Sequence, residues 1–227
     1  MQNNLRAIIF DMDGVIADSE PHWDQIDGDL LRENGVEYAG EHKAQVLGKS
    51  FPLAIEFYKQ QYSLAPPLSQ LMERREIIAA DYYASSIPIF PDAPEVLQSL
   101  RELDLPLGMA TSSVGALARP FLKRHHLEDY FDIVVSGEEV ERGKPHPDIY
   151  LLAAQKLGIA PQDCLVIEDS LAGVQSAKTA GMCVAAIPDA RYVDVKDYEN
   201  NADFVLNNLG EVPDLVRRVL PRGEKKP

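Results

Sequence analysis

The chain has 227 residues, 45% of them hydrophobic and 26% charged, a length that suits one large domain or a domain that carries an insert. Its formal net charge of -14 disfavours nucleic acid and anionic membranes as partners, because like charges repel. The N-terminal residues lack a secretory signal pattern, and no apolar run approaches the roughly 20 residues that span a bilayer. We therefore expect a cytoplasmic protein, a monomer or weak dimer, that binds neither nucleic acid nor membranes.

Short apolar runs alternate with helical patterns along most of the chain. The runs predict buried strands at residues 5–10, 105–111, 131–136, 164–167 and 183–187, with residues 204–206 as a candidate sixth, edge strand. Helical periodicity covers residues 96–103, 149–157 and 171–180, and glycines follow the last two as C-terminal caps. This alternation favours parallel βαβ units and a doubly wound α/β fold.

Residues 17–87 depart from this rhythm. They contain no strand-like run but show helical patterns at residues 23–34, 52–62 and 69–83. Pro88 and Pro91 mark the end of the segment. The sequence thus predicts a catalytic core made of residues 1–16 and 88–227, with a small α-helical cap domain, residues 17–87, inserted after the first strand.

Two carboxylates end the first predicted strand, in the order Phe10-Asp11-Met12-Asp13-Gly14. Ligands of open α/β sheets bind beyond the carboxyl ends of the strands. Acids are costly to bury there unless a cation or hydrogen-bond donors stabilise them. A strand followed by a solvated Asp-Gly turn is the plainer interpretation of this motif taken alone.

The later strand ends also carry polar groups. These groups are the hydroxyls of Thr111-Ser112-Ser113, the cation of Lys144 and the acidic pair Glu168-Asp169. Each one alone is typical of a loop, a surface charge or a helix N-cap. Together, in this order, they indicate phosphoryl transfer.

The chemistry of such a set is consistent. Hard oxygen ligands suit Mg²⁺, and a metal with a lysine neutralises the charge that keeps a carboxylate from attacking an anionic phosphate. A carboxylate nucleophile divides one difficult step into two. A second carboxylate can protonate the leaving group and then activate water.

The motifs DMDGV, ATSS, GKPHPDIY and IEDSLAGV resemble those of the haloacid dehalogenase superfamily, in its phosphatase branch with a helical cap after the first motif. The resemblance extends over about residues 5–220. It implies a Rossmann-like core and an Mg²⁺-dependent phosphatase for small phosphate monoesters. Within the branch, the chain looks like sugar-phosphate and polyol-phosphate phosphatases and β-phosphoglucomutase.

The resemblance also implies roles for individual residues. Asp11 looks like the nucleophile, Asp13 the general acid and base, Thr111 the hydroxyl of the second motif, and Lys144 the lysine that holds nucleophile and phosphate. The implied Mg²⁺ ligands are Asp11, the main-chain carbonyl of Asp13, and Asp169 helped by Glu168. The candidate substrate-binding residues are Thr111, Ser112, Ser113, Lys144, Glu20, His22 and Lys49, the last within a Gly48-Lys49-Ser50 cap loop.

Three other functions stay open: a phosphomutase, a signalling phospho-acceptor and a non-catalytic protein. In the mutases that the chain resembles, a histidine restrains the general acid and base until sugar binds; here Trp23 occupies that place and His22 lies one residue earlier, which favours a hydrolase over a phosphomutase. Signalling receiver domains share the residue types but place the acidic pair first and the acceptor later, and they lack a cap. A non-catalytic protein that kept the fold would have no need for all four motifs.

Overall fold

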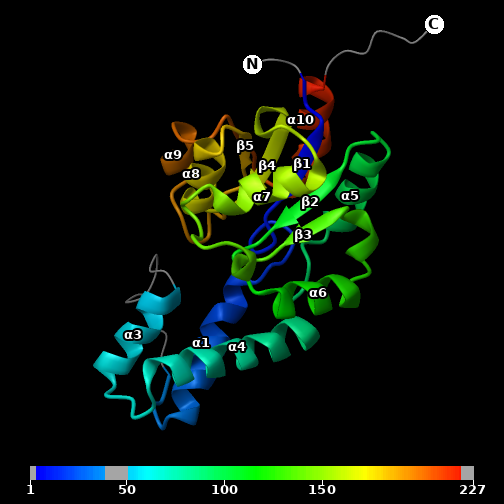
Figure 1. The fold of residues 1–227 in the computed structure, drawn as a ribbon. Helices are drawn as coiled ribbons and strands as arrows, with labels where there is room; N and C mark the ends of the chain where they lie inside the picture. The colour runs from blue at the N-terminus through cyan, green and yellow to red at the C-terminus, as the bar shows by residue number, and fades with distance from the viewer. Residues whose placement is uncertain (1–3, 39–50, 221–227) are drawn as a thin grey trace, which may run out of the picture. The chain divides into compact units, whose positions relative to one another are not determined.

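The computed structural model describes residues 4–38 and 51–220. The chain divides into two compact units, with boundaries between Asp18 and Ser19 and between Ile87 and Pro88 (Figure 1). The predicted Gly48-Lys49-Ser50 loop lies outside the described residues, as do residues 221–227.

The first unit contains a six-stranded sheet of order β3-β2-β1-β4-β5-β6, in which every neighbouring pair is parallel. This order is that of a Rossmann-like doubly wound sheet. All six predicted strands are confirmed, and the last is an edge strand. Their bounds are β1 (Ala7–Phe10), β2 (Leu107–Ala110), β3 (Ile133–Val135), β4 (Cys164–Glu168), β5 (Cys183–Ala186) and β6 (Phe204–Val205).

Helices flank this sheet (Figure 1). They are α5 (Ala93–Arg101), α6 (Gly115–Arg124), α7 (Asp148–Leu157), α8 (Leu171–Thr179), α9 (Lys196–Glu199) and α10 (Val212–Val219), with short 3-10 helices at Glu128–Tyr130, Gly137–Glu139, Pro161–Asp163 and Leu209–Glu211. The predicted ends of α7 and α8 are confirmed, because Gly158 and Gly181 adopt the left-handed conformation there, with φ of 69° and 79°. In the part of the chain that the structure covers, no helix is long and apolar enough to cross a membrane.

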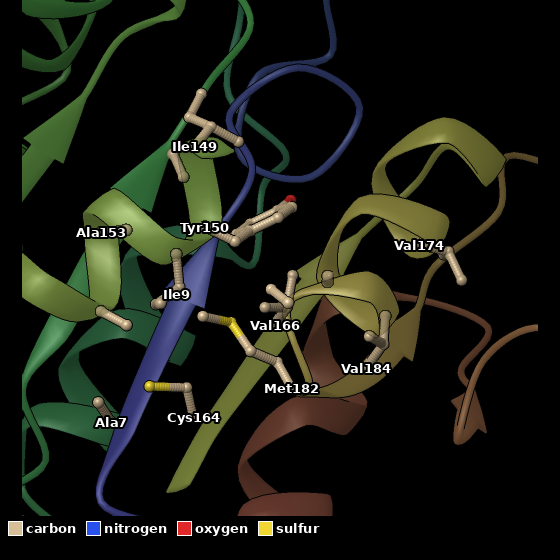
Figure 2. Packing of buried hydrophobic residues seen from close by; sticks show 14 of the residues in the cluster. Ala7, Ile9, Ile149, Tyr150, Ala153, Cys164, Val166, Val174, Met182 and Val184 are labelled. Atoms are coloured by element: carbon tan, nitrogen blue, oxygen red, sulfur yellow. The ribbon is translucent and has the colours of Figure 1, made fainter. Parts of the chain in front are cut away.

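One hydrophobic cluster of this unit lies between the sheet and the helices α7 and α8. Helix α7 packs on β1, β2 and β3, while α8 packs on β4 and β5. Figure 2 shows Ile9 of β1 and Val166 of β4 in the same cluster as Tyr150 of α7. All four residues of β1 are fully buried, as expected for a central parallel strand covered on both faces.

The second unit is helical, as the sequence predicts. It comprises α1 (Glu20–Glu33), α3 (Phe51–Gln61) and α4 (Leu68–Ser85), and α4 packs against both other helices. Ile26 and Leu30 of α1 are buried together with the rings of Tyr58 and Tyr83. Their burial on one side of each helix supplies the apolar core of this unit.

A charged pair lies within that apolar core. Arg75 Nε donates to Asp27 Oδ1 at 2.5 Å, and the two side chains are only 11% and 9% exposed. The Tyr58 hydroxyl donates to Asp27 Oδ2 at 3.2 Å, and the guanidinium of Arg75 stacks 4.7 Å from the ring centroid of Trp23. Both charges are therefore compensated at the cost of their hydration.

Removal of one partner should destabilise the second unit strongly. We expect Arg75→Ala to lower the free energy of unfolding by about 3–5 kcal/mol, because Asp27 is left buried without its opposite charge. The neighbouring Arg74→Ala is the matched control, since Arg74 pairs with Glu33 at 44% and 41% side-chain exposure, and it should cost about 1 kcal/mol or less. Urea unfolding followed by tryptophan fluorescence measures both; equal losses would contradict the argument.

Candidate active site

The site begins at the carboxyl ends of three adjacent strands. β1 pairs with β2 on one side and β4 on the other, so the residues that follow them, Asp11, Thr111 and Asp169, emerge at one edge of the sheet. The Asp11 N–H donates to the carbonyl of Ile167 at 2.9 Å, so the hydrogen bonds between β1 and β4 continue as far as Asp11. The backbone of Asp11 is thus fixed by the sheet.

The turn after β1 requires glycine. Gly14 has φ of 75°, and a Cβ there would stand 2.0 Å from Asp169 Oδ2. Glycine thereby lets the loop that carries Asp13 approach the carboxylate at the end of β4.

Lys144 links the two acidic motifs. Its Nζ lies 2.8 Å from Asp11 Oδ1 and 2.5 Å from Glu168 Oε1, and its side chain is 6% exposed. Burial by itself would lower the pKa of Lys144, but the charges of Asp11 and Glu168 raise it well above its ordinary value. Lys144 is therefore a buried ammonium.

Glu168 accepts four hydrogen bonds. Oε1 accepts from Lys144 and, at 2.9 Å, from the Tyr150 hydroxyl, while Oε2 accepts from the N–H and hydroxyl of Ser170 at 2.8 and 3.0 Å. Burial opposes its ionisation, yet Lys144 and these donors together lower the pKa of Glu168. It remains charged although its side chain is wholly buried.

Helix α8 secures this arrangement at two points. Ser170 caps the helix by accepting from the N–H of Gly173 at 3.1 Å. Further along α8, the Ser176 hydroxyl donates to the carbonyl of His146 at 2.6 Å. The loop that carries Lys144 is thus tied to the helix that follows the acidic pair.

Three carboxylates converge on one point that can hold a metal ion. Asp11, Glu168 and Asp169 each offer an oxygen within 4.8 Å of the others. Burial raises the pKa of Asp11 to about 7 and that of Asp169 well above its ordinary value, with neighbouring carboxylates adding to both shifts. Asp11 Oδ1 forms an ion pair with Lys144 at 2.8 Å, so one ammonium faces three clustered carboxylates. An all-oxygen set of carboxylates that outnumber their cation fits a hard divalent cation.

Comparison with known proteins decides the family. The family model described as haloacid dehalogenase-like hydrolase matches residues 8–187. The chain belongs to the haloacid dehalogenase-like hydrolase family. The resemblance predicted from the four motifs and the expected fold class are both confirmed.

The haloacid dehalogenase-like relatives include proteins named for carbohydrate phosphates. Hexitol phosphatase B of Escherichia coli O157:H7 is 31% identical over 207 residues, 90% of each chain, and a phosphorylated carbohydrates phosphatase of Thermotoga maritima is 31% identical over 182 residues, 78% of this chain and 82% of its own. Among solved structures, a candidate β-phosphoglucomutase of Thermotoga maritima superposes with a TM-score of 0.81 at 27% identity, over 95% of this chain and all of that one.

The hydroxyls of the second motif do not all face the same way. Thr111 is fully buried and Ser112 is exposed. Ser113 donates its hydroxyl to Asp13 Oδ2 at 2.9 Å, and Thr111 Oγ1 lies 3.4 Å from the same oxygen. The structure therefore brings Ser113 to the second carboxylate of the first motif.

The predicted cap residues lie in the second unit. Glu20 and His22 stand in the first turn of α1, and the His22 ring packs edge-on against Tyr82 with centroids 6.2 Å apart. Lys49 lies outside the described residues. Trp23 packs against Tyr83, with ring centroids 5.8 Å apart, and against Arg75.

Tyr150 and Ser176 were not predicted as site residues. Tyr150 contacts Glu168, and Ser176 holds the loop that carries Lys144. The sequence contains one signal for Tyr150, since it follows Lys144 by six residues within the GKPHPDIY motif of the haloacid dehalogenase family. Ser176 has no such signal.

The close approach of α8 to Glu168 predicts an unusual glycine effect. Gly173→Ala should normally favour a helix, but a Cβ at Gly173 would stand 1.6 Å from Glu168 Oε1. We expect the substitution to destabilise the protein by about 1–3 kcal/mol and to displace Glu168. Gly143→Ala is the control, because a Cβ there meets nothing within 4 Å. A Gly173→Ala variant as stable as the parent in urea would refute this packing.

Proposed function

We propose that this chain is a Mg²⁺-dependent phosphatase that hydrolyses small phosphate monoesters, sugar or sugar-alcohol phosphates, through a phosphoaspartate on Asp11. The observation that carries the proposal is the pairing of Asp11 with a buried ammonium, Lys144 Nζ, 2.8 Å away at the end of the central strand. The relatives named for hexitols and phosphorylated carbohydrates support the substrate class.

Two carboxylates divide the reaction between them. The Asp11 carboxylate attacks phosphorus, so that an Asp11 O–P bond forms as the ester P–O bond breaks, and Asp13 gives its proton to the leaving alkoxide. Water then attacks the phosphoaspartate, Asp13 takes a proton from that water, and phosphate leaves with Asp11 regenerated. Each half-reaction uses Asp13 in the opposite protonation state.

The other residues lower the electrostatic barrier and hold the substrate. Lys144 places a positive charge beside the nucleophile, which reduces repulsion between Asp11 and the anionic phosphate. Thr111 and Ser112 supply hydroxyls for phosphate oxygens. Asp11, the Asp13 carbonyl and Asp169, supported by Glu168, would hold Mg²⁺, which would neutralise further phosphate charge when bound.

A phosphomutase is the second candidate. The structural likeness to a candidate β-phosphoglucomutase favours it. Against it, the place where mutases of this type carry a restraining histidine is Trp23, whose ring packs against Tyr83 and Arg75 within the second unit. An indole in that packing offers no base to hold Asp13 away from water.

Mg²⁺ binding should be measurable without turnover. At about 100 times its dissociation constant Mg²⁺ should add about 2.7 kcal/mol to the stability of the folded state, seen as a rise in Tm by calorimetry. Asp169→Asn should abolish most of this rise, because it removes a ligand charge. Asp214→Asn, at an exposed ion pair, should retain it. A rise that survives in Asp169→Asn would place the ion elsewhere.

Turnover should depend on the Asp11 carboxylate. Asp11→Asn should abolish phosphate release from a panel of sugar and sugar-alcohol phosphates, since an amide cannot form the phosphoaspartate. Asp214→Asn should keep the parent rate. The parent enzyme, given β-glucose 1-phosphate and a trace of glucose 1,6-bisphosphate, should yield free phosphate by phosphorus NMR. Rapid conversion to glucose 6-phosphate with little free phosphate would establish the mutase instead.

A further inference from the structure

The hydroxyls of Ser113 and Thr111 both approach Asp13 Oδ2, and that of Ser113 lies nearer. Ser113 Oγ lies 2.9 Å from Asp13 Oδ2, whereas Thr111 Oγ1 lies 3.4 Å from it, at the limit of a hydrogen bond. The Ser113 N–H in turn donates to Thr111 Oγ1 at 3.0 Å. Ser113 is therefore fixed by its own backbone while its side chain reaches across from the end of β2 to the loop after β1.

We propose that Ser113 is a positioning residue whose hydroxyl, 2.9 Å from Asp13 Oδ2, holds the carboxyl group of Asp13 in place for proton transfer. This inference rests on the proposed acid and base role of Asp13. It assigns Ser113 to Asp13 rather than to the substrate phosphate, the role that the motif alone suggested.

The chemistry of a hydroxyl suits this task. A serine hydroxyl donates one hydrogen bond and accepts others, so it donates to Asp13 as a carboxylate and accepts from Asp13 as an acid. An ammonium or a backbone N–H only donates, and it would favour the carboxylate alone. Because Asp13 must give a proton in one half-reaction and take one in the next, a partner that rotates between the two roles keeps Oδ2 in place throughout.

A phosphate-binding role and an Asp13-positioning role for Ser113 predict different changes in activity when the hydroxyl is removed. A phosphate contact serves every phosphate monoester alike, so its removal would weaken all substrates by a similar factor. A contact that aims Asp13 matters most where the leaving oxygen needs a proton. An alkyl ester leaves as a strongly basic alkoxide and depends on that proton, whereas p-nitrophenyl phosphate leaves as a stabilised phenolate and depends on it little.

The test compares kcat/KM for p-nitrophenyl phosphate and for a sugar-alcohol phosphate in four variants. The ratio kcat/KM reports the steps up to release of the alcohol, so the hydrolysis of the phosphoaspartate common to both esters does not mask the effect. We expect Ser113→Ala to lower kcat/KM for the sugar-alcohol phosphate by about 10- to 100-fold, part of the 10²- to 10⁴-fold that general acid catalysis supplies. For p-nitrophenyl phosphate the loss should be less than about threefold.

The other three variants separate the inference from its premise. Ser113→Thr keeps the hydroxyl, so kcat/KM for the sugar-alcohol phosphate should stay near the parent value. Ser99→Ala is the control, because the Ser99 hydroxyl contacts Arg217 away from the site, and both kcat/KM values should match the parent. Asp13→Asn should show the same discrimination more strongly. If Asp13→Asn lowers kcat/KM for both esters by the same factor, the acid role of Asp13 is wrong and the inference is wrong with it. If Asp13→Asn lowers kcat/KM mainly for the sugar-alcohol phosphate but Ser113→Ala lowers it equally for both esters, only the positioning role of Ser113 is overturned. Should Ser113→Ala unfold, Ser113→Val gives the same comparison, because it removes the hydroxyl and matches the shape of Ser113→Thr.

Discussion

The ammonium of Lys144, buried between the carboxylates of Asp11 and Glu168, is the interaction on which the rest of the site depends. Three carboxylates near one another inside a protein would take up protons, and the raised pKa values of Asp11 and Asp169 express that tendency. Lys144 and the donors around Glu168 keep part of this charge in its ionised form. The negative charge of the remaining carboxylates is not compensated by Lys144, so a further cation beside Asp11 would be stabilised there.

The residues around Lys144 are themselves held by several hydrogen bonds. Glu168 contacts nothing that the proposed reaction consumes, yet it accepts four hydrogen bonds. It accepts from Lys144, and Tyr150 and Ser170, the residue that caps α8, donate to it as well. A carboxylate nucleophile beside a loosely held lysine would lose part of its electrostatic support to reorganisation.

The sequence predicted the parts of this structure that depend on local pattern. Buried β-branched runs identified all six strands, and acids and hydroxyls at their ends indicated the site. Helix α6 was not predicted, because Gly115 at its start and Pro120 inside it both count against a helix, and only its packing, through Leu117 and Phe121, decides for one. Contacts such as Ser113 to Asp13 join residues 100 positions apart, and their choice between rotamers is set by tertiary packing.

The neck of the inserted unit has a consequence for how such proteins diversify. The segment that leaves the first unit and the segment that returns to it are hydrogen-bonded to each other. The Asp18 N–H donates to the Pro88 carbonyl at 3.0 Å and the Phe90 N–H to the Ile16 carbonyl at 2.9 Å, and Ala17 forms an antiparallel bridge with Ile89. In topological terms the whole helical unit is a long loop closing a short hairpin. The closure entropy of a loop grows only slowly with its length. An insert of different size or sequence can therefore be exchanged at this hairpin while β1 and the residues after it keep their places.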